Sequence, residues 1–140
     1  MKRLAYTIIL TTAILAITSC EKQESYKDGD WEAIQIDKTA IEFPKEGGKA
    51  AVTRSNYSRW WISTAYQSAK WSGNHWDYQE PIGQITYSVD GSWYDANVSD
   101  EGKSSILEIT VDPNDTNAER RGLIVMTVGD SFISITIQQQ

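Results

Sequence analysis

Short segments in which apolar and polar residues alternate dominate this chain from Ile34 onward. The clearest examples are Leu107, Ile109 and Val111 in one segment and Ile133, Ile135 and Ile137 in another. Successive side chains of an extended strand point to opposite faces, so a period of two places the apolar side chains together on one buried face. No stretch keeps the period of an amphipathic helix for long. The pattern therefore predicts an all-β fold.

Turn residues divide the alternating segments into about seven to eight strands, the number typical of an immunoglobulin-like β-sandwich. The turn at residues 44–48, Pro-Lys-Glu-Gly-Gly, predicts a hairpin between the strands on either side of it. Gly129-Asp130 predicts a second, tight hairpin between residues 123–128 and 131–138. We expect residues 106–111 to lie beside this second hairpin as a third antiparallel strand.

The N-terminus has a composition of its own. Lys2 and Arg3 precede an apolar run over residues 4–17, which is shorter than the ~20 residues needed to cross a bilayer. This order is typical of a signal peptide, over residues 1–19. Ile17-Thr18-Ser19-Cys20 resembles the bacterial lipobox, which implies that Cys20 becomes the acylated first residue of the mature chain. We expect residues 20–31 to be a polar tether, residues 32–140 a single domain, and the outer membrane to be the site of attachment through Cys20.

Cysteine content and charge exclude several classes of function. Cys20 is the only cysteine, so the domain has no disulfide and no thiol for catalysis. Removing Lys2 and Arg3 from the 13 basic residues leaves 11 against 19 acidic residues, a formal net charge of −8. Such a charge repels nucleic acid and anionic lipid headgroups. The expected partners are therefore a glycan or another protein, with no nucleic acid.

A family resemblance covers residues 34–138. The residues that carry it are Phe43, Gly47-Gly48, Val52, Ser55-Asn56, Trp60-Trp61-Ile62, Trp93, Ile109-Thr110-Val111, Asn114-Asp115-Thr116, Arg120-Arg121-Gly122, Ile124 and Ile135-Thr136-Ile137-Gln138. This pattern resembles the BACON domain, a name that abbreviates Bacteroidetes-associated carbohydrate-binding, often N-terminal. The resemblance implies an immunoglobulin-like sandwich from a glycan-foraging bacterium and a role in binding glycan or mucin, although some members of the family are spacers.

The sequence departs from the family pattern in two places. Family members usually precede a larger module, whereas this sequence ends at Gln140 with the predicted sandwich, so we expect a protein of one module. Residues 67–83 form a longer connection than the family's usual loop. We expect this aromatic-rich insertion to be a loop that carries whatever is individual to this protein.

The insertion holds most of the candidate ligand-binding residues. Sugars present apolar C–H faces ringed by hydroxyl groups, so a sugar site combines flat aromatic rings with polar side chains. Residues 71–80, Trp-Ser-Gly-Asn-His-Trp-Asp-Tyr-Gln-Glu, offer both. The candidates here are Trp71, Asn74, His75, Trp76 and Tyr78. The alternative is that these aromatic residues form a small cluster that holds the insertion in place.

Strand parity sorts three further tryptophans. Trp60 shares a face with Ile62 and is expected in the core, which leaves Trp61 on the opposite face as a candidate site residue. In the strand over residues 93–98, Tyr94 belongs to the expected core face. Trp93 then shares the other face with Asp95 and Asn97, so parity leaves its role ambiguous, and Trp93 is the last candidate site residue.

No catalytic pattern is present in the sequence. It lacks the Gly-x-Ser-x-Gly elbow, the phosphate-binding loop and the HExxH zinc motif. His75 is the only histidine, which is too few nitrogen or sulfur ligands for a zinc site. We therefore expect no enzyme activity, no catalytic residue, no metal and no cofactor. Two hypotheses stay open: a surface lipoprotein that binds glycans, and a structural or protein-interaction accessory lipoprotein of an outer-membrane complex.

Overall fold

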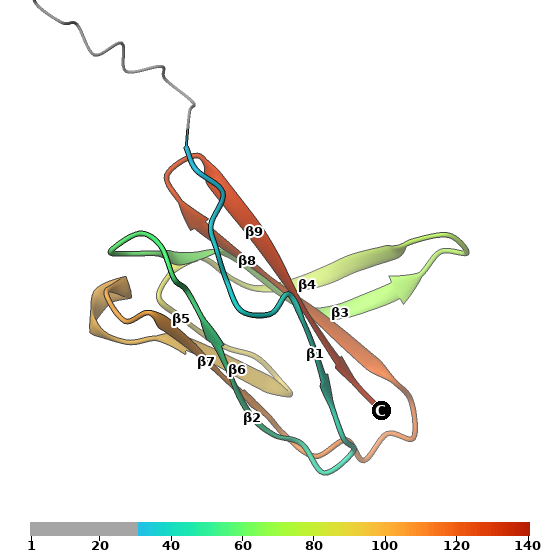
Figure 1. Cartoon of the computed structure of the whole chain (residues 1–140). Helices are drawn as coiled ribbons and strands as arrows, with labels where there is room; N and C mark the ends of the chain where they lie inside the picture. Colours follow the sequence, from blue (N-terminus) through green and yellow to red (C-terminus); the bar gives the residue numbers. More distant parts are fainter. Residues whose placement is uncertain (1–30) are drawn as a thin grey trace, which may run out of the picture.

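The computed structural model describes residues 31–140, apart from the side chains of Ala69, Trp71 and Trp76. The signal peptide, Cys20 and the tether up to residue 30 lie outside the described residues. Within them, the chain forms nine strands and one short 3-10 turn (Figure 1). The elements are β1 (Ala40–Phe43), β2 (Gly48–Thr53), β3 (Trp61–Trp71), β4 (Trp76–Thr86), β5 (Ser88–Asp90), β6 (Tyr94–Val98), η1 (Asp100–Gly102), β7 (Ile106–Val111), β8 (Arg120–Val128) and β9 (Ser131–Gln139).

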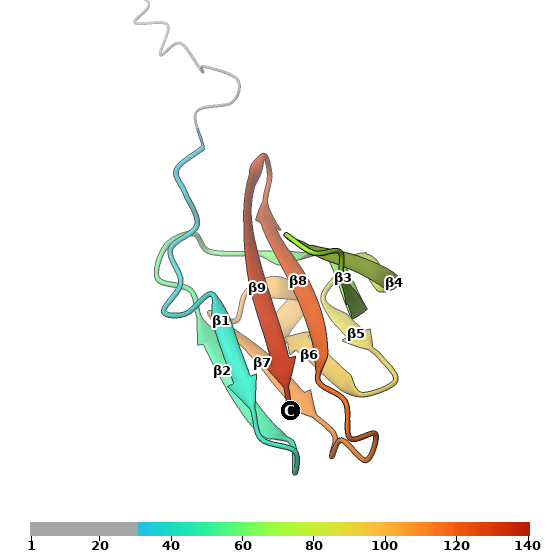
Figure 2. The ribbon, with the colours of Figure 1, turned by 90° about the vertical axis from the view of Figure 1, so that its right-hand side faces the viewer.

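The strands form two sheets that face each other, so the predicted all-β sandwich is confirmed (Figure 2). One sheet has five strands in the order β1-β9-β8-β3-β4, and the other has four in the order β2-β7-β6-β5. All pairs are antiparallel except β1 and β9, which run parallel. The nine strands exceed the expected seven to eight because a break at Tyr87 makes the short β5 a strand separate from β4.

The core lies between the two sheets and follows the predicted alternation. Leu107, Ile109 and Val111 of β7 are buried, and Ile135 and Ile137 of β9 are buried opposite them. Every second residue on these strands is directed away from the core. The parity that sequence analysis assigned to β7 and β9 is therefore confirmed.

Two large aromatic side chains join the sheets. Trp60 is fully buried, and its indole Nε1–H donates to the carbonyl of Ser104 at 2.9 Å. Tyr94 is buried on β6, and its hydroxyl donates to the carbonyl of Tyr66 on β3 at 2.8 Å. Burial raises the pKa of the Tyr94 hydroxyl, so it stays a protonated donor. Both residues lie in the core, as strand parity predicts.

The predicted hairpin across residues 44–48 is wrong. β1 pairs with β9 in the five-stranded sheet, whereas β2 pairs with β7 in the four-stranded sheet. The turn between them therefore carries the chain from one sheet to the other. Apolar alternation shows that two neighbouring segments are strands, but either arrangement buries their apolar faces equally well.

The second predicted hairpin is correct in part. β8 and β9 pair through the turn at Gly129 and Asp130, as expected. β7 does not join them, because it lies between β2 and β6 in the opposite sheet. The connection after β7 crosses the sandwich, and a buried Asn114 holds this crossing by donating to the carbonyls of Ala118 and Gln140.

The insertion is a hairpin rather than a loop. β3 and β4 pair along nearly their whole length, from Ile62 opposite Thr86 to Trp71 opposite Trp76. The far half of this hairpin projects beyond the two sheets (Figure 1). Aromatic residues favour strands, and here that preference prevails over the polar residues that suggested a loop.

Candidate functional site

A groove opens where β3 begins and β4 ends. Its volume is about 360 Å³, and it is lined by Arg59, Trp61, Ile85, Thr86 and Tyr87. Trp61 is half-buried, while Tyr87 is 37% exposed and Ile85 is 81% exposed. Arg59 is the only charged residue among these five. The groove thus presents two aromatic rings, an aliphatic side chain and a guanidinium group, and its size falls in the range of small-ligand sites.

The backbone beneath the groove fixes Tyr87 and Arg59. Gly102 has a φ of +83°, and a Cβ there would lie 2.7 Å from Cε1 of Tyr87 and 3.1 Å from Cγ of Arg59. The carbonyl of Tyr87 also accepts a hydrogen bond from the amide of Val98 at 2.7 Å. A Cβ at Gly102 would clash first with the backbone carbonyl of Trp60 and would also displace Tyr87 and Arg59. Glycine is therefore required at this position beneath the groove.

Ile85 is the least expected residue of the groove. Its φ of +48° lies in the left-handed region, where a β-branched side chain is strained by about 1–3 kcal/mol. Glycine or asparagine would make the same bend at lower cost. The side chain gains little from burial in return, because 81% of it is exposed. Neither the backbone conformation nor the packing of the described residues accounts for an isoleucine at this position.

The predicted polar candidates at the hairpin tip bond to one another. Asn74 and His75 are exposed, and Nδ1 of His75 lies 2.5 Å from Oδ1 of Asn74. Nε2 of the same ring lies 2.8 Å from Oδ1 of Asp77. The hydroxyl of Ser72 donates to the carbonyl of His75 and closes the turn. These contacts account for the polar residues as turn-forming groups.

The predicted aromatic candidates of the hairpin lie at two positions along it, one beside Tyr66 and the others at its end. Tyr78 is half-buried, with its ring centroid 6.5 Å from that of Tyr66 on the neighbouring strand. Trp71 and Trp76 are cross-strand partners at the end of the hairpin, and their side chains lie outside the described part of the chain. The backbone therefore separates these three residues from the groove and places them along the projecting half of the hairpin.

Trp93 has no free ring face. It is 5% exposed, its ring packs edge-on against Tyr94 at 4.8 Å, and the guanidinium of Arg120 lies 4.8 Å from its centroid. Its indole N–H donates to the carbonyl of Gln67 at 2.5 Å. The assignment of Trp93 to the face opposite Tyr94 fails because Trp93 precedes β6, in an irregular segment where the alternation of a strand does not apply.

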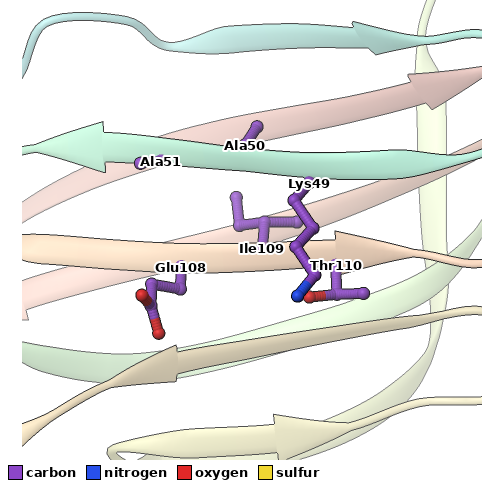
Figure 3. A pocket seen from close by; sticks show the side chains of 6 residues that line it. All are labelled: Lys49, Ala50, Ala51, Glu108, Ile109 and Thr110. Carbon is purple, nitrogen blue, oxygen red and sulfur yellow. The ribbon is translucent and has the colours of Figure 1, made fainter.

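Two other cavities lack the features of the groove. One, of about 340 Å³, lies over the pairing of β2 and β7 and is lined by Lys49, Ala50, Ala51, Glu108, Ile109 and Thr110, with Lys49 extended toward Thr110 (Figure 3). It contains no aromatic residue. The other, of about 250 Å³, includes Gln67, Glu80 and Trp93, but the ring of Trp93 is covered by Arg120. Neither cavity offers an open aromatic face.

Two further features concern metals and membranes. In the described part of the chain, no group of three or more His, Cys, Asp or Glu residues is arranged to hold a metal ion. Residues 31–140 also include no helix with the length and apolarity to span a membrane.

Comparison with known proteins finds a family model that matches the C-terminal part of the chain. Residues 76–140 match the family model of BACON, whose description is "Putative binding domain, N-terminal". The resemblance to BACON domains is confirmed over these residues. The BACON match contains β4 to β9, so Ile85, Thr86 and Tyr87 lie within it, while Arg59 and Trp61 precede it.

Solved structures place the BACON-like sandwich in a known fold. It is similar to an NMR structure of a protein from Bacteroides thetaiotaomicron, with a TM-score of 0.62 and 22% sequence identity over 81% of this chain and 92% of that one. It also matches a Bacteroides ovatus GH5 xyloglucanase in complex with a XXXG heptasaccharide, with a TM-score of 0.49 and 22% identity. That match covers 77% of this chain and 19% of the xyloglucanase. Among curated proteins, none matches this chain.

Sequence reasoning found one member of the groove and missed the others. Trp61 was expected to be outward-facing, and it lines the groove. Tyr87 belongs to the aromatic-rich part of the sequence, which was its only signal. Ile85 gave none, because nothing in the sequence marks an isoleucine that adopts a left-handed backbone.

Proposed function

We propose that this chain is a non-catalytic lipoprotein of the cell envelope that binds glycans through the groove between Trp61 and Tyr87. The single observation that carries the proposal is Ile85, which is strained and exposed at the mouth of a groove with two aromatic rings. A sugar ring covers aromatic faces with its C–H groups, and its hydroxyl groups bond to the groups around them. The description of BACON as a binding domain supports the same proposal.

The polar surroundings of the groove suit a sugar. The guanidinium of Arg59 offers donors beside the aromatic rings, whereas the hydroxyl of Thr86 donates to the carbonyl of Ser88 at 3.0 Å. Arginine forms paired hydrogen bonds with carboxylates, so acidic sugars are favoured among the ligands that the aromatic rings accept. No acidic residue lines this groove, so no carboxylate there would repel an acidic sugar.

Attachment through Cys20 completes the proposal. The described chain begins at the end of the sandwich that carries the β8–β9 turn, where the ring of Trp31 packs over Gly129 (Figure 1). With a signal peptide over residues 1–19 and an acylated Cys20, the tether would connect the outer membrane to this end of the domain. In the producing bacterium, a Cys20→Ala change should move the protein from the membrane fraction to the soluble fraction.

A protein partner is the second candidate function. Ile85 belongs to β4, which is an edge strand, and edge strands accept additional strands from other chains. However, Glu80 and Ile85 both have left-handed φ values and Pro81 lies between them, so the edge of β4 is irregular. Such irregularities hinder strand addition. The open edge therefore favours this candidate less than the aromatic groove favours a glycan.

A glycan microarray tests the proposed function. The probe is the soluble chain from Glu21 onward, which contains all nine strands, beside a Trp61→Ala variant and a Trp71→Ala/Trp76→Ala double variant. We expect binding by the unmodified chain and by the double variant, and its loss in Trp61→Ala with the circular dichroism spectrum unchanged. Failure of the unmodified chain to bind any glycan would refute the proposal and leave the protein partner.

A further inference from the structure

The groove is continuous with a line of residues on the outer face of the five-stranded sheet. Thr127 of β8 lies directly opposite Trp61 of β3 on one side and opposite Phe132 of β9 on the other. Met126 and Val128 of β8 are buried in the core, so alternation assigns Thr127 between them to the outer face. Thr127 is itself only 4% exposed, and its hydroxyl donates to the carbonyls of Gly129 and Ser131. Trp61, Thr127 and Phe132 therefore form one row that crosses three strands.

Phe132 is the most exposed aromatic residue of this row. It is 60% exposed, on a strand whose alternate residues Ile135 and Ile137 are fully buried. With a spacing of about 4.8 Å between strands, the backbones of Trp61 and Phe132 lie about 10 Å apart. This distance exceeds the length of one sugar ring, so a single sugar cannot cover both aromatic residues.

A polar row runs beside the aromatic one. Val125 of β8 lies opposite Ser134 of β9 and opposite Thr64 of β3, and Thr64 lies opposite Gln84 of β4. This row is two residues further along β8 and β9, about 7 Å from the first, and three residues further along β3, where the register shifts between Ile62 and Thr64. Ser134 and Gln84 are exposed. The face thus combines aromatic rings in one line with hydroxyl and amide groups in the next.

We propose that the glycan site extends from the groove across β8 to Phe132, and that its ligand is a chain of several sugar units lying across β4, β3, β8 and β9. The inference rests on the proposed function and adds the length and direction of the ligand. An extended sugar chain presents apolar faces at intervals and hydroxyl groups along its edge, which matches an aromatic row beside a polar row. A purely apolar occupant would leave the exposed side chains of Ser134 and Gln84 without hydrogen-bond partners, whereas the hydroxyl of Thr64 between them is buried.

Calorimetric titration with sugar chains of increasing length tests this inference. The probes are the di-, tetra- and hexasaccharides of the cello-, manno- and galacturono-oligosaccharide series, added to the soluble chain, to Phe132→Ala and to Trp61→Ala. In the series that binds, we expect the hexasaccharide to bind the unmodified chain about tenfold more tightly than the disaccharide. Phe132→Ala should remove this gain and leave disaccharide binding unchanged.

The controls separate the two proposals. Ile106→Ala removes an exposed apolar side chain from the opposite sheet and should change nothing. Phe132→Leu keeps an apolar side chain without a ring and should behave as Phe132→Ala. Binding that depends on Trp61 but has the same length dependence in Phe132→Ala would overturn the extended site and leave the groove as proposed. No binding by any series, or binding indifferent to Trp61→Ala, would overturn both.

Discussion

At the scale of the residue, Ile85 links the fold to the proposed function. A side chain that is strained in its backbone and exposed to solvent contributes little to the stability of the free protein. Proteins retain such residues where a bound molecule contacts them, at some cost in stability. Replacing Ile85 should therefore raise the stability of the domain and weaken ligand binding.

Replacing Ile85 with asparagine should stabilise the domain by about 1 kcal/mol, because asparagine adopts a left-handed φ more readily and little buried area is lost. Urea denaturation of the soluble chain measures the change. Thr86→Asn, at a neighbouring position outside the left-handed region, serves as the control and should give no gain. An Ile85→Asn variant no more stable than the unmodified chain would show that the backbone strain inferred at this position is absent.

Asp95 offers a second test at this scale. It lies opposite Asp90 in the pairing of β5 and β6. Desolvation first, and then Asp90 and Asp112, raise the pKa of the Asp95 carboxyl. A carboxyl with a folded-state pKa above its unfolded value holds its proton more tightly in the folded state, so stability falls as the pH rises through that interval.

Asp95→Asn should therefore stabilise the domain near neutral pH, and the gain should disappear in acid, below the unfolded pKa. Chemical denaturation of both proteins, near neutral pH and in acid, measures the difference in the free energy of unfolding. Asp130→Asn, which removes the same charge from the β8–β9 turn, is the matched control. An equal gain for Asp95→Asn at both pH values would contradict the assignment of its effect to ionisation.

At the scale of the element, the β3–β4 hairpin divides into two parts. The half near the sandwich pairs with β8 and carries Trp61 and Ile85, whereas the projecting half carries the candidates predicted from the sequence. The core residues found in the described part of β3 end at Ala65, and among the described side chains of β4 only the partly buried Ile82 packs against the core. The projecting half is thus peripheral to both the core and the groove.

Replacing residues 69–78 with Asn-Gly, which joins Ser68 to its partner Gln79 through a two-residue turn, should leave the domain folded. We expect its melting temperature to fall by only a few degrees, because none of the side chains described between residues 69 and 78 belongs to the core. Glycan binding, measured by the same titration, should persist. A folded shortened hairpin that binds nothing would place the ligand at the tip instead of the groove.

Sequence alone predicted the elements better than their arrangement. Alternation predicts which faces of β6, β7 and β9 are buried, because that information is local to each strand. It does not tell whether β1 and β2 share a sheet, since this depends on packing between distant segments. The groove was beyond prediction for the same reason: Trp61, Ile85 and Tyr87 meet only after β3 and β4 pair, and the bend at Ile85 has no sequence signal.

At the scale of the whole molecule, the proposals form one arrangement. The lipid would attach at the end of the sandwich where Trp31 packs on the β8–β9 turn, and Phe132 and Trp61 lie in a row near that same turn. A glycan chain bound across this face would run across the strands rather than along them. The domain would then hold a polysaccharide close to the surface of the cell.

The most direct test follows the six tryptophan indole N–H signals by NMR while the glycan that binds best on the array is added to the soluble chain. The indoles of Trp60 and Trp93 donate to the carbonyls of Ser104 and Gln67 inside the fold, so their signals should stay in place. We predict that the signal of Trp61 shifts in a saturable way. A shift confined to Trp71 and Trp76, with Trp61 unmoved, would contradict the groove as the binding site.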